Sequence, residues 1–243
     1  LTFVSEQTIR EKLETGHKTK VIPILRKLGK SRREEGQRKA GNMIVSHFGK
    51  GNDSGSQFAN IYQDTNEIYK ERSVSPDKIP QALEKYEDAG VLILVDDFIG
   101  TGNQARGQIQ QYLDESKEQL VKRGIHVVVL YVTGLGASAE KLEADLRKEL
   151  DPLELTVHVV DQLGEENKCF SDESMFFDAV SERTNAKEIA KKYGAITENN
   201  ESRVLGHGNN QLAIVFPRAI PNNSLPILWK KNGNWNPLFS RHG

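Results

Sequence analysis

The chain alternates between short apolar runs and longer segments of mixed polarity. Residues 91–95 are apolar throughout, and similar runs cover residues 127–132 and 155–160. Runs of this length predict strands that are buried on both faces, as in a parallel sheet covered by helices. Residues 103–123 and 138–150, which separate the runs, have the length and composition of helices. The alternation therefore predicts an α/β fold with a doubly wound, mostly parallel sheet.

The segments around this alternation are expected to be mainly helical. Residues 6–48 have a helical pattern, in which Pro23 starts or kinks one helix and Ser31 caps a helix over residues 32–48. Residues 43–48 fit a strand as well as a helix. Further helices are expected over residues 57–71, over a segment that ends at Ala89, and over residues 174–183 and 186–193.

The length of 243 residues suits one large α/β domain with appendages, or two small domains. The C-terminal part differs from the rest, because a strand at 212–216 is followed by a turn rich in Pro and Asn and by an apolar segment at 225–229. We therefore divide the chain into an N-terminal helical region (1–50), an α/β core (51–200) and a C-terminal β/loop extension (201–243).

Positive charge gathers at the two ends of the chain. Residues 1–50 carry 12 Lys/Arg against 5 Asp/Glu, and residues 202–243 carry 5 Lys/Arg and no acid. Solvated helix faces explain this pattern, while contact with nucleic acid, an acidic partner or a second copy stays open. The single Cys169 excludes an internal disulfide, and the six histidines lack the spacing of metal ligands. Without a membrane-spanning run or a secretory signal, we expect a cytoplasmic protein that does not enter membranes.

The strongest chemical signal follows the first apolar strand. Asp96 and Asp97 come directly after residue 95, and a Gly-Thr-Gly-Asn loop at 100–103 leads into a helix. In an open parallel sheet, ligands bind beyond the carboxyl ends of the strands. Two adjacent carboxylates need partners such as ribose hydroxyls or a hydrated magnesium ion, and a glycine-bearing loop before a helix offers N–H groups to phosphate. The unit therefore predicts binding of a ribose 5-phosphate.

This segment resembles the phosphoribosyl pyrophosphate motif of type I phosphoribosyltransferases, which joins an apolar strand, two acids, two apolar residues and a Thr/Gly-rich loop. The resemblance implies that Asp96 and Asp97 hold the ribose 2- and 3-hydroxyls, take part in catalysis, and meet Mg²⁺ indirectly through substrate or water. The loop that would bind the 5-phosphate consists of Gly100, Thr101, Gly102, Asn103 and Gln104. Two of these depart from the family pattern, which usually has Thr in place of Gly100 and Thr or Ser in place of Gln104.

The same family has a second loop, which grips pyrophosphate near the sheet edge. The candidate is Ser54-Gly55-Ser56, with Lys50 as a further contributor, because this flexible stretch precedes a helix whose N–H groups can face an anion. A plain linker remains an equal interpretation of these residues.

The C-terminal segments at 212–216 and 221–229 carry a second resemblance. They resemble phosphoribosyltransferase-like proteins of bacterial conflict and phage-defence gene clusters, some of which lie beside retrons. The resemblance implies either a hood over the base or a surface that docks a partner. A hairpin whose Trp229 fills a core is an equal alternative.

The first functional hypothesis is a phosphoribosyltransferase that binds phosphoribosyl pyrophosphate, or a related ribose 5-phosphate nucleotide, with Mg²⁺ as cofactor. An effector role in bacterial anti-phage defence is part of this hypothesis. The second is a non-catalytic module that senses a nucleotide or binds a nucleic acid or a protein in a defence complex. Association of several copies stays open under both hypotheses.

A third, weaker hypothesis is a dinucleotide-dependent enzyme. Gly134 and Gly136 follow an apolar strand and open a helix, and Asp161 ends the next strand, as in a dinucleotide-binding fingerprint. A tight strand-to-helix turn that needs glycine is the favoured interpretation.

Overall fold

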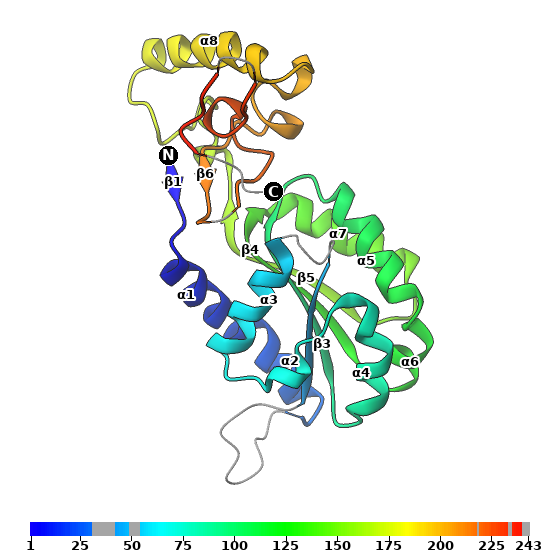
Figure 1. The fold of residues 1–243 in the computed structure, drawn as a ribbon. Coiled ribbons are helices and arrows are strands. Elements are labelled where there is room, and N and C mark those ends of the chain that lie inside the picture. Colours follow the sequence, from blue (N-terminus) through cyan, green and yellow to red (C-terminus); the bar gives the residue numbers. More distant parts are fainter. Residues whose placement is uncertain (31–41, 49–53, 218, 233–234, 240–243) are drawn as a thin grey trace. The chain divides into compact units, whose positions relative to one another are not determined.

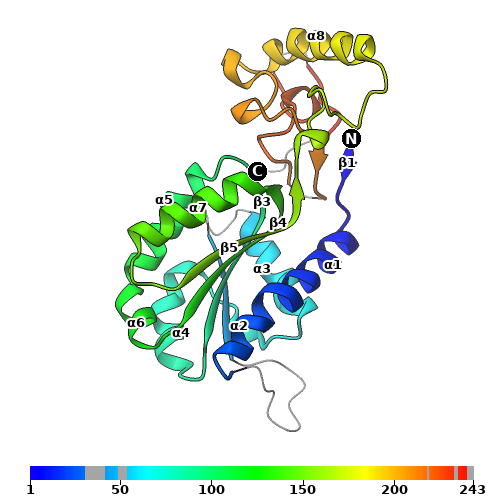
Figure 2. The same cartoon turned by 180° about the vertical axis from the view of Figure 1, so that it is seen from behind.

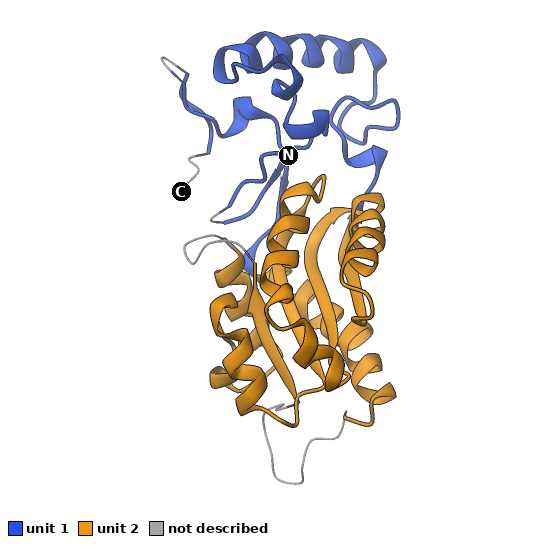
Figure 3. Cartoon of the chain, turned by 90° about the vertical axis from the view of Figure 1, so that its right-hand side faces the viewer, with its two compact units in different colours: residues 1–6, 163–243 blue, residues 7–162 orange. Residues whose placement is uncertain are grey.

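The computed structural model describes residues 1–30, 42–48, 54–217, 219–232 and 235–239. The chain forms two compact units, which Figure 3 distinguishes by colour. Unit 2 is Gln7–Gln162, and unit 1 combines Leu1–Glu6 with Leu163–Gly243. This division differs from the expected boundaries after residues 50 and 200, because the N-terminal helices group with the sheet and the first six residues group with the C-terminal part of the chain.

Unit 2 is built on a four-stranded sheet with the strand order β2-β3-β4-β5. The strands are β2 (Met43–His47), β3 (Val91–Ile99), β4 (His126–Leu135) and β5 (Leu155–Leu163) (Figure 1). Both β2 and β4 pair with β3 in parallel, so that Val45 and Val128 flank Ile93. The predicted parallel α/β architecture is confirmed. The helix predicted at 32–48 is wrong for residues 43–47, which form the strand that was the alternative.

Helices cover both faces of this sheet, as Figures 1 and 2 show from opposite sides. One face carries α4 (Ile79–Lys85), α5 (Asn103–Asp114), α6 (Lys117–Lys122) and α7 (Gly136–Glu149). Their apolar side chains share a buried core with the strands, to which Leu83, Leu113 and Leu142 contribute beside Leu94. The other face carries α1 (Glu6–Gly16), the π-helix η1 (His17–Val21), α2 (Ile22–Lys27) and α3 (Ser54–Thr65).

The N-terminal helices belong to unit 2 because they lie directly against the sheet. Leu13 is fully buried, and a Cβ atom added at Gly16 would lie 2.7 Å from Cγ2 of Val160 in β5. His17 is buried in the π-helix, where its Nδ1 lies 2.5 Å from the hydroxyl of Tyr62 in α3. This contact joins two helices on the same face of the sheet.

The remaining segments of unit 2 are short and follow the prediction less closely. The helix predicted at 103–123 is split into α5 and α6 at Ser116, and the helix predicted at 57–71 is α3, which runs from Ser54 to Thr65. Two 3-10 turns lead from α3 toward α4, at Lys70–Arg72 and Pro76–Lys78. Beside them, Val74 N–H donates to the carbonyl oxygen of Val45 at 2.9 Å, which covers the outer edge of β2.

Unit 1 pairs the first residues of the chain with a late segment. β1 (Thr2–Phe3) and β6 (Ile214–Val215) form a two-stranded parallel sheet. One helix, α8 (Val180–Thr197), replaces the two predicted at 174–183 and 186–193, and the prediction is wrong for residues 174–179, which are not helical. The 3-10 helices of this unit are Glu165–Asn167, Glu201–Arg203, His207–Asn209 and Pro226–Leu228. Within the described ranges, no helix of either unit combines the length and apolarity needed to cross a membrane.

Candidate functional site

The acid pair lies in the last part of β3, at the edge where parallel strands present ligand sites. Asp97 is 9% exposed and Asp96 is half-buried. Each carboxylate accepts a hydrogen bond from the next backbone N–H, Asp96 Oδ1 from Asp97 at 2.9 Å and Asp97 Oδ1 from Phe98 at 2.8 Å. These bonds hold both side chains back against the strand, so the pair is a preorganised feature of the sheet and not of a long loop.

The predicted phosphate loop connects β3 to α5. Gly102 has φ 74°, a left-handed conformation that favours glycine, and it forms the N-cap of α5 without a side-chain hydrogen bond from the described residues. Its carbonyl accepts the N–H of Arg106 at 3.0 Å, which starts the helical ladder. The first-turn N–H groups of α5 are therefore left for solvent or an anion. Exposure rises along the loop from buried to open, in the order Gly100, Thr101, Gly102, Asn103 and Gln104.

The second predicted loop follows β2 and leads into α3. Ser54 and Gly55 begin the helix, and Ser56 is half-buried in its first turn. The strand that the sequence left in doubt is present as β2, so a strand precedes α3 in the chain, as expected for a helix N-terminus that binds an anion. Lys50, the further contributor predicted here, lies outside the described residues.

The position of Gly55 shows that the start of α3 meets the acid pair of β3. A Cβ atom placed on it would lie 3.4 Å from Asp96 Oδ1 and 2.9 Å from the carbonyl oxygen of Phe48. The structure therefore brings the N-terminal turn of α3 against the acid pair, although about forty residues separate them in the sequence. Two helix N-termini, those of α3 and α5, follow the two adjacent strands β2 and β3 at this edge.

Comparison with protein families adds a decisive observation. The model of one family, described as PRTase-CE, matches residues 1–241. The chain belongs to the PRTase-CE family. This confirms, at the level of the family, the predicted resemblance to phosphoribosyltransferase-like proteins of conflict systems.

Other comparisons are more distant. A solved structure of adenine phosphoribosyltransferase from Leishmania donovani is 15% identical to the PRTase-CE chain, covers 74% of it and 77% of its own length, and superposes with a TM-score of 0.33. A comparison with curated proteins gives no match.

One residue beside the acid pair was missed by sequence reasoning. Tyr131 of β4 lies beside Asp96 in the strand register and is fully buried. Burial raises the pKa of its phenol well above the usual value, and the charges of Asp96 and Asp97 raise it further. The Tyr131 ring contacts Phe48 edge-on, with ring centroids 5.7 Å apart. In the sequence, Tyr131 is one member of an apolar run, and only strand pairing reveals its position.

The glycines of the dinucleotide hypothesis have a packing explanation. Gly134 pairs with Ile99 across β3 and β4, and a Cβ atom added to it would lie 2.8 Å from Ile99 N and overlap the Ile99 carbonyl oxygen. The close approach of the two strands therefore requires glycine at this position. His207, the lone histidine of a glycine-rich loop, belongs to unit 1.

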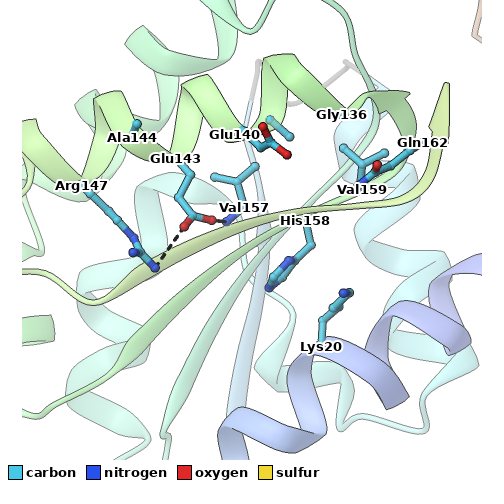
Figure 4. A pocket seen from close by; sticks show the side chains of 11 residues that line it. Lys20, Gly136, Glu140, Glu143, Ala144, Arg147, Val157, His158, Val159 and Gln162 are labelled. Atoms are coloured by element: carbon cyan, nitrogen blue, oxygen red, sulfur yellow. Dashed lines mark hydrogen bonds and ion pairs between the residues drawn. The ribbon is translucent and has the colours of Figure 1, made fainter. Parts of the chain in front are cut away.

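A separate cavity of about 490 Å³ lies along β5, the outer strand of the sheet (Figure 4). Glu143 of α7 accepts the Val157 N–H at 2.8 Å, and Arg147 donates to the Leu155 carbonyl oxygen at 2.7 Å. The His158 side chain points away from α7, toward Lys20 (Figure 4). Burial is the main cause that lowers the pKa of His158, and the positive charge of Lys20 lowers it further. Gly136, a candidate of the dinucleotide hypothesis, lines this cavity, whereas the residues predicted to bind phosphoribosyl pyrophosphate do not.

Proposed function

We propose that this PRTase-CE chain binds phosphoribosyl pyrophosphate, or a related ribose 5-phosphate nucleotide, and transfers the phosphoribosyl group to a nucleophile. The observation that carries the proposal is the meeting of Gly55, at the start of α3, with Asp96 in β3. The acid pair can bind the ribose hydroxyls, and the N-termini of α3 and α5 can bind phosphates. All of these groups follow or end adjacent strands at one edge of the sheet, as a ribose that carries phosphates at two positions requires.

Each part of the site has a distinct task in this proposal. Asp96 and Asp97 accept hydrogen bonds from the ribose 2- and 3-hydroxyls. The backbone N–H groups of residues 100–104 bind the 5-phosphate, with the Thr101 hydroxyl as a further donor. The first turn of α3, at residues 54–56, faces the pyrophosphate. Contacts to the 5-phosphate lie away from the reacting carbon and supply binding energy that orients it.

The transfer itself needs little from the protein beyond position and charge. The bond between the anomeric carbon and the pyrophosphate oxygen breaks, and its electron pair leaves with pyrophosphate. A lone pair of the nucleophile, which is a nitrogen base or water, forms the new bond, and its proton passes to solvent. The ring becomes oxocarbenium-like as the bond breaks, and the carboxylates of the acid pair stabilise this positive charge.

The acid pair also fits the Mg²⁺ ion expected as cofactor, in an indirect way. In the described part of the chain, no group of three or more His, Cys, Asp or Glu side chains is placed to cage a metal. Mg²⁺ keeps several waters and is usually held by one or two carboxylates together with substrate phosphates. Asp96 and Asp97 would hold it in this way, through water or substrate. When bound, the ion would neutralise charge on the departing pyrophosphate.

Calorimetric titration with phosphoribosyl pyrophosphate and Mg²⁺ tests the proposal. Asp97→Asn keeps the shape of the side chain and removes its charge, so we expect an unchanged melting temperature and an affinity reduced about 10- to 100-fold. Asp114→Asn, at the exposed end of α5, is the matched control and should bind like the wild type. Equal affinity of Asp97→Asn and wild type would contradict the proposal.

The alternative function is a module that binds the nucleotide without transferring it. Gly100 and Gln104, which lack the hydroxyls usual at these positions in the resembling family, favour this alternative. Release of pyrophosphate distinguishes the two, because a sensor binds the ligand and leaves it intact. Salt-dependent binding of DNA or RNA would support the nucleic-acid version. We further propose an effector role in anti-phage defence, which a plaque assay with Asp97→Asn tests.

A further inference from the structure

Tyr131 carries a buried hydroxyl for which the described structure provides no partner. Its side chain is 0% exposed, and its hydroxyl forms no hydrogen bond with any described residue. Buried polar groups are nearly always paired, because leaving one unpaired is costly. This unpaired hydroxyl in the middle of β4 therefore calls for a partner that binds it, or turns toward it, in another state of the protein.

The surroundings of this hydroxyl identify the partner. Asp96 is the strand neighbour of Tyr131, and Phe48, which follows the last residue of β2, packs against the Tyr131 ring. The charges of Asp96 and Asp97 both act on the phenol, so both carboxylates are within electrostatic reach. A phenol has an ordinary pKa of about 10, so the Tyr131 hydroxyl is protonated at neutral pH and can act as a donor.

The Asp96 carboxylate can accept several hydrogen bonds at once. A carboxylate has about four lone-pair positions, and the Asp97 N–H donates to Oδ1 of Asp96 at 2.9 Å. A ribose hydroxyl that binds Asp96 fixes the carboxylate in one orientation. A donor on the neighbouring strand then determines whether that orientation is stable, since hydrogen bonds to a charged group are stronger than those between neutral groups.

We propose that Tyr131 is a positioning residue, whose hydroxyl donates a hydrogen bond to the Asp96 carboxylate when the ribose diol is bound. This inference rests on the proposed function, because it concerns the same ligand. The acid pair binds the sugar, and Tyr131, which the sugar does not reach, holds one of the two acids in the orientation that the sugar needs.

Tyr131→Phe removes only the hydroxyl. Because this hydroxyl is unpaired in the structure described here, we expect an unchanged or slightly higher melting temperature. Affinity for phosphoribosyl pyrophosphate should fall by roughly tenfold to a hundredfold, the effect of one hydrogen bond to a charged group. Tyr62→Phe is the matched control, because its hydroxyl already lies 2.5 Å from His17 Nδ1. It should lower the melting temperature and leave the affinity unchanged.

A spectroscopic readout separates positioning from a merely structural role. A phenol that becomes a hydrogen-bond donor shifts its near-ultraviolet absorption to longer wavelength. Adding phosphoribosyl pyrophosphate should produce this difference band in the wild type and in Tyr62→Phe, and the band should be absent from Tyr131→Phe.

The outcomes are distinguishable. If the wild type does not bind the ligand, the proposed function fails and this inference fails with it. If the wild type binds and Tyr131→Phe binds equally well, or shows the same difference band, only the role of Tyr131 is overturned. A weaker but otherwise stable Tyr131→Phe that lacks the band supports the inference.

Discussion

Gly55 is the position at which a single methyl group tests the geometry of the site. In most helices, Gly→Ala stabilises the protein by roughly 0.5–1 kcal/mol, because alanine loses less backbone entropy on folding. In Gly55→Ala, however, the new Cβ atom would lie 2.9 Å from the Phe48 carbonyl oxygen and 3.4 Å from Asp96 Oδ1. The first contact is too short, so the start of α3 or the end of β2 must shift.

The cost of such overpacking is about 1–3 kcal/mol, which exceeds the gain from helix propensity. We therefore expect Gly55→Ala to be less stable than the wild type by about 1–2 kcal/mol. The shift also displaces the helix N-terminus from the acid pair. Affinity for phosphoribosyl pyrophosphate should fall about tenfold, which corresponds to roughly 1.4 kcal/mol.

Gly107 provides the matched control, because it lies inside α5 and no described atom is within 4 Å of an added Cβ atom. Gly107→Ala should be stabilised by roughly 0.5–1 kcal/mol, which raises the melting temperature by about 1–4 °C for a protein of this size. Its affinity should be unchanged. Thermal unfolding and calorimetric titration of both variants suffice. If Gly55→Ala gains stability as Gly107→Ala does and binds equally well, the contact between α3 and the acid pair is refuted.

Three other predictions concern the rest of the fold. Gly134→Ala should lower stability by at least about 2 kcal/mol, because its Cβ atom would overlap the backbone of Ile99; an unchanged melting temperature would exclude the close approach of β3 and β4. Burial raises the pKa of the Cys169 thiol to about 11, so a thiol reagent at about pH 8 should react slowly with the native protein and rapidly in denaturant. Rapid native labelling would show that the cysteine is accessible. The Arg106 hydrogen bond lowers the pKa of Glu149, so its contribution is present above the ordinary Glu pKa and disappears as pH falls through the lowered value. The difference in melting temperature between wild type and Arg106→Gln should therefore shrink in acid, and a difference that persists at about pH 3 would contradict the assignment.

The parts of the fold that the sequence predicted well are those encoded by neighbouring residues. The uninterrupted apolar run at 91–95 marks β3, and the acids that follow it mark the edge where ligands bind. Strand β2 was ambiguous because it contains Ser46 and His47, both of which are buried. Ser46 is accommodated because its hydroxyl donates to the carbonyl oxygen of Val74 at 2.8 Å. That partner lies well outside any local window, so the pattern of β2 could not reveal it.

Features that depend on distant pairings were missed for the same reason. The position of Tyr131 beside Asp96 follows from the register of two strands that a pair of helices separates. The interruption expected near residue 185 is absent, because residues 180–197 form one continuous helix, α8, in which the Thr184 hydroxyl donates to the Val180 carbonyl oxygen at 2.9 Å. The roles of the site residues themselves stay predictions, since geometry alone does not identify a ligand.

The pairing of Thr2 with Ile214 has a consequence for how the protein is made. Unit 2 is continuous in the sequence, so all of its residues leave the ribosome before most of unit 1 is translated. Unit 1 is completed only when β1 meets β6, which is synthesised about two hundred residues later and therefore roughly 10–40 s later at ordinary rates of translation. During that interval β1 has no strand to pair with, whereas every strand of the four-stranded sheet of unit 2 has already been synthesised.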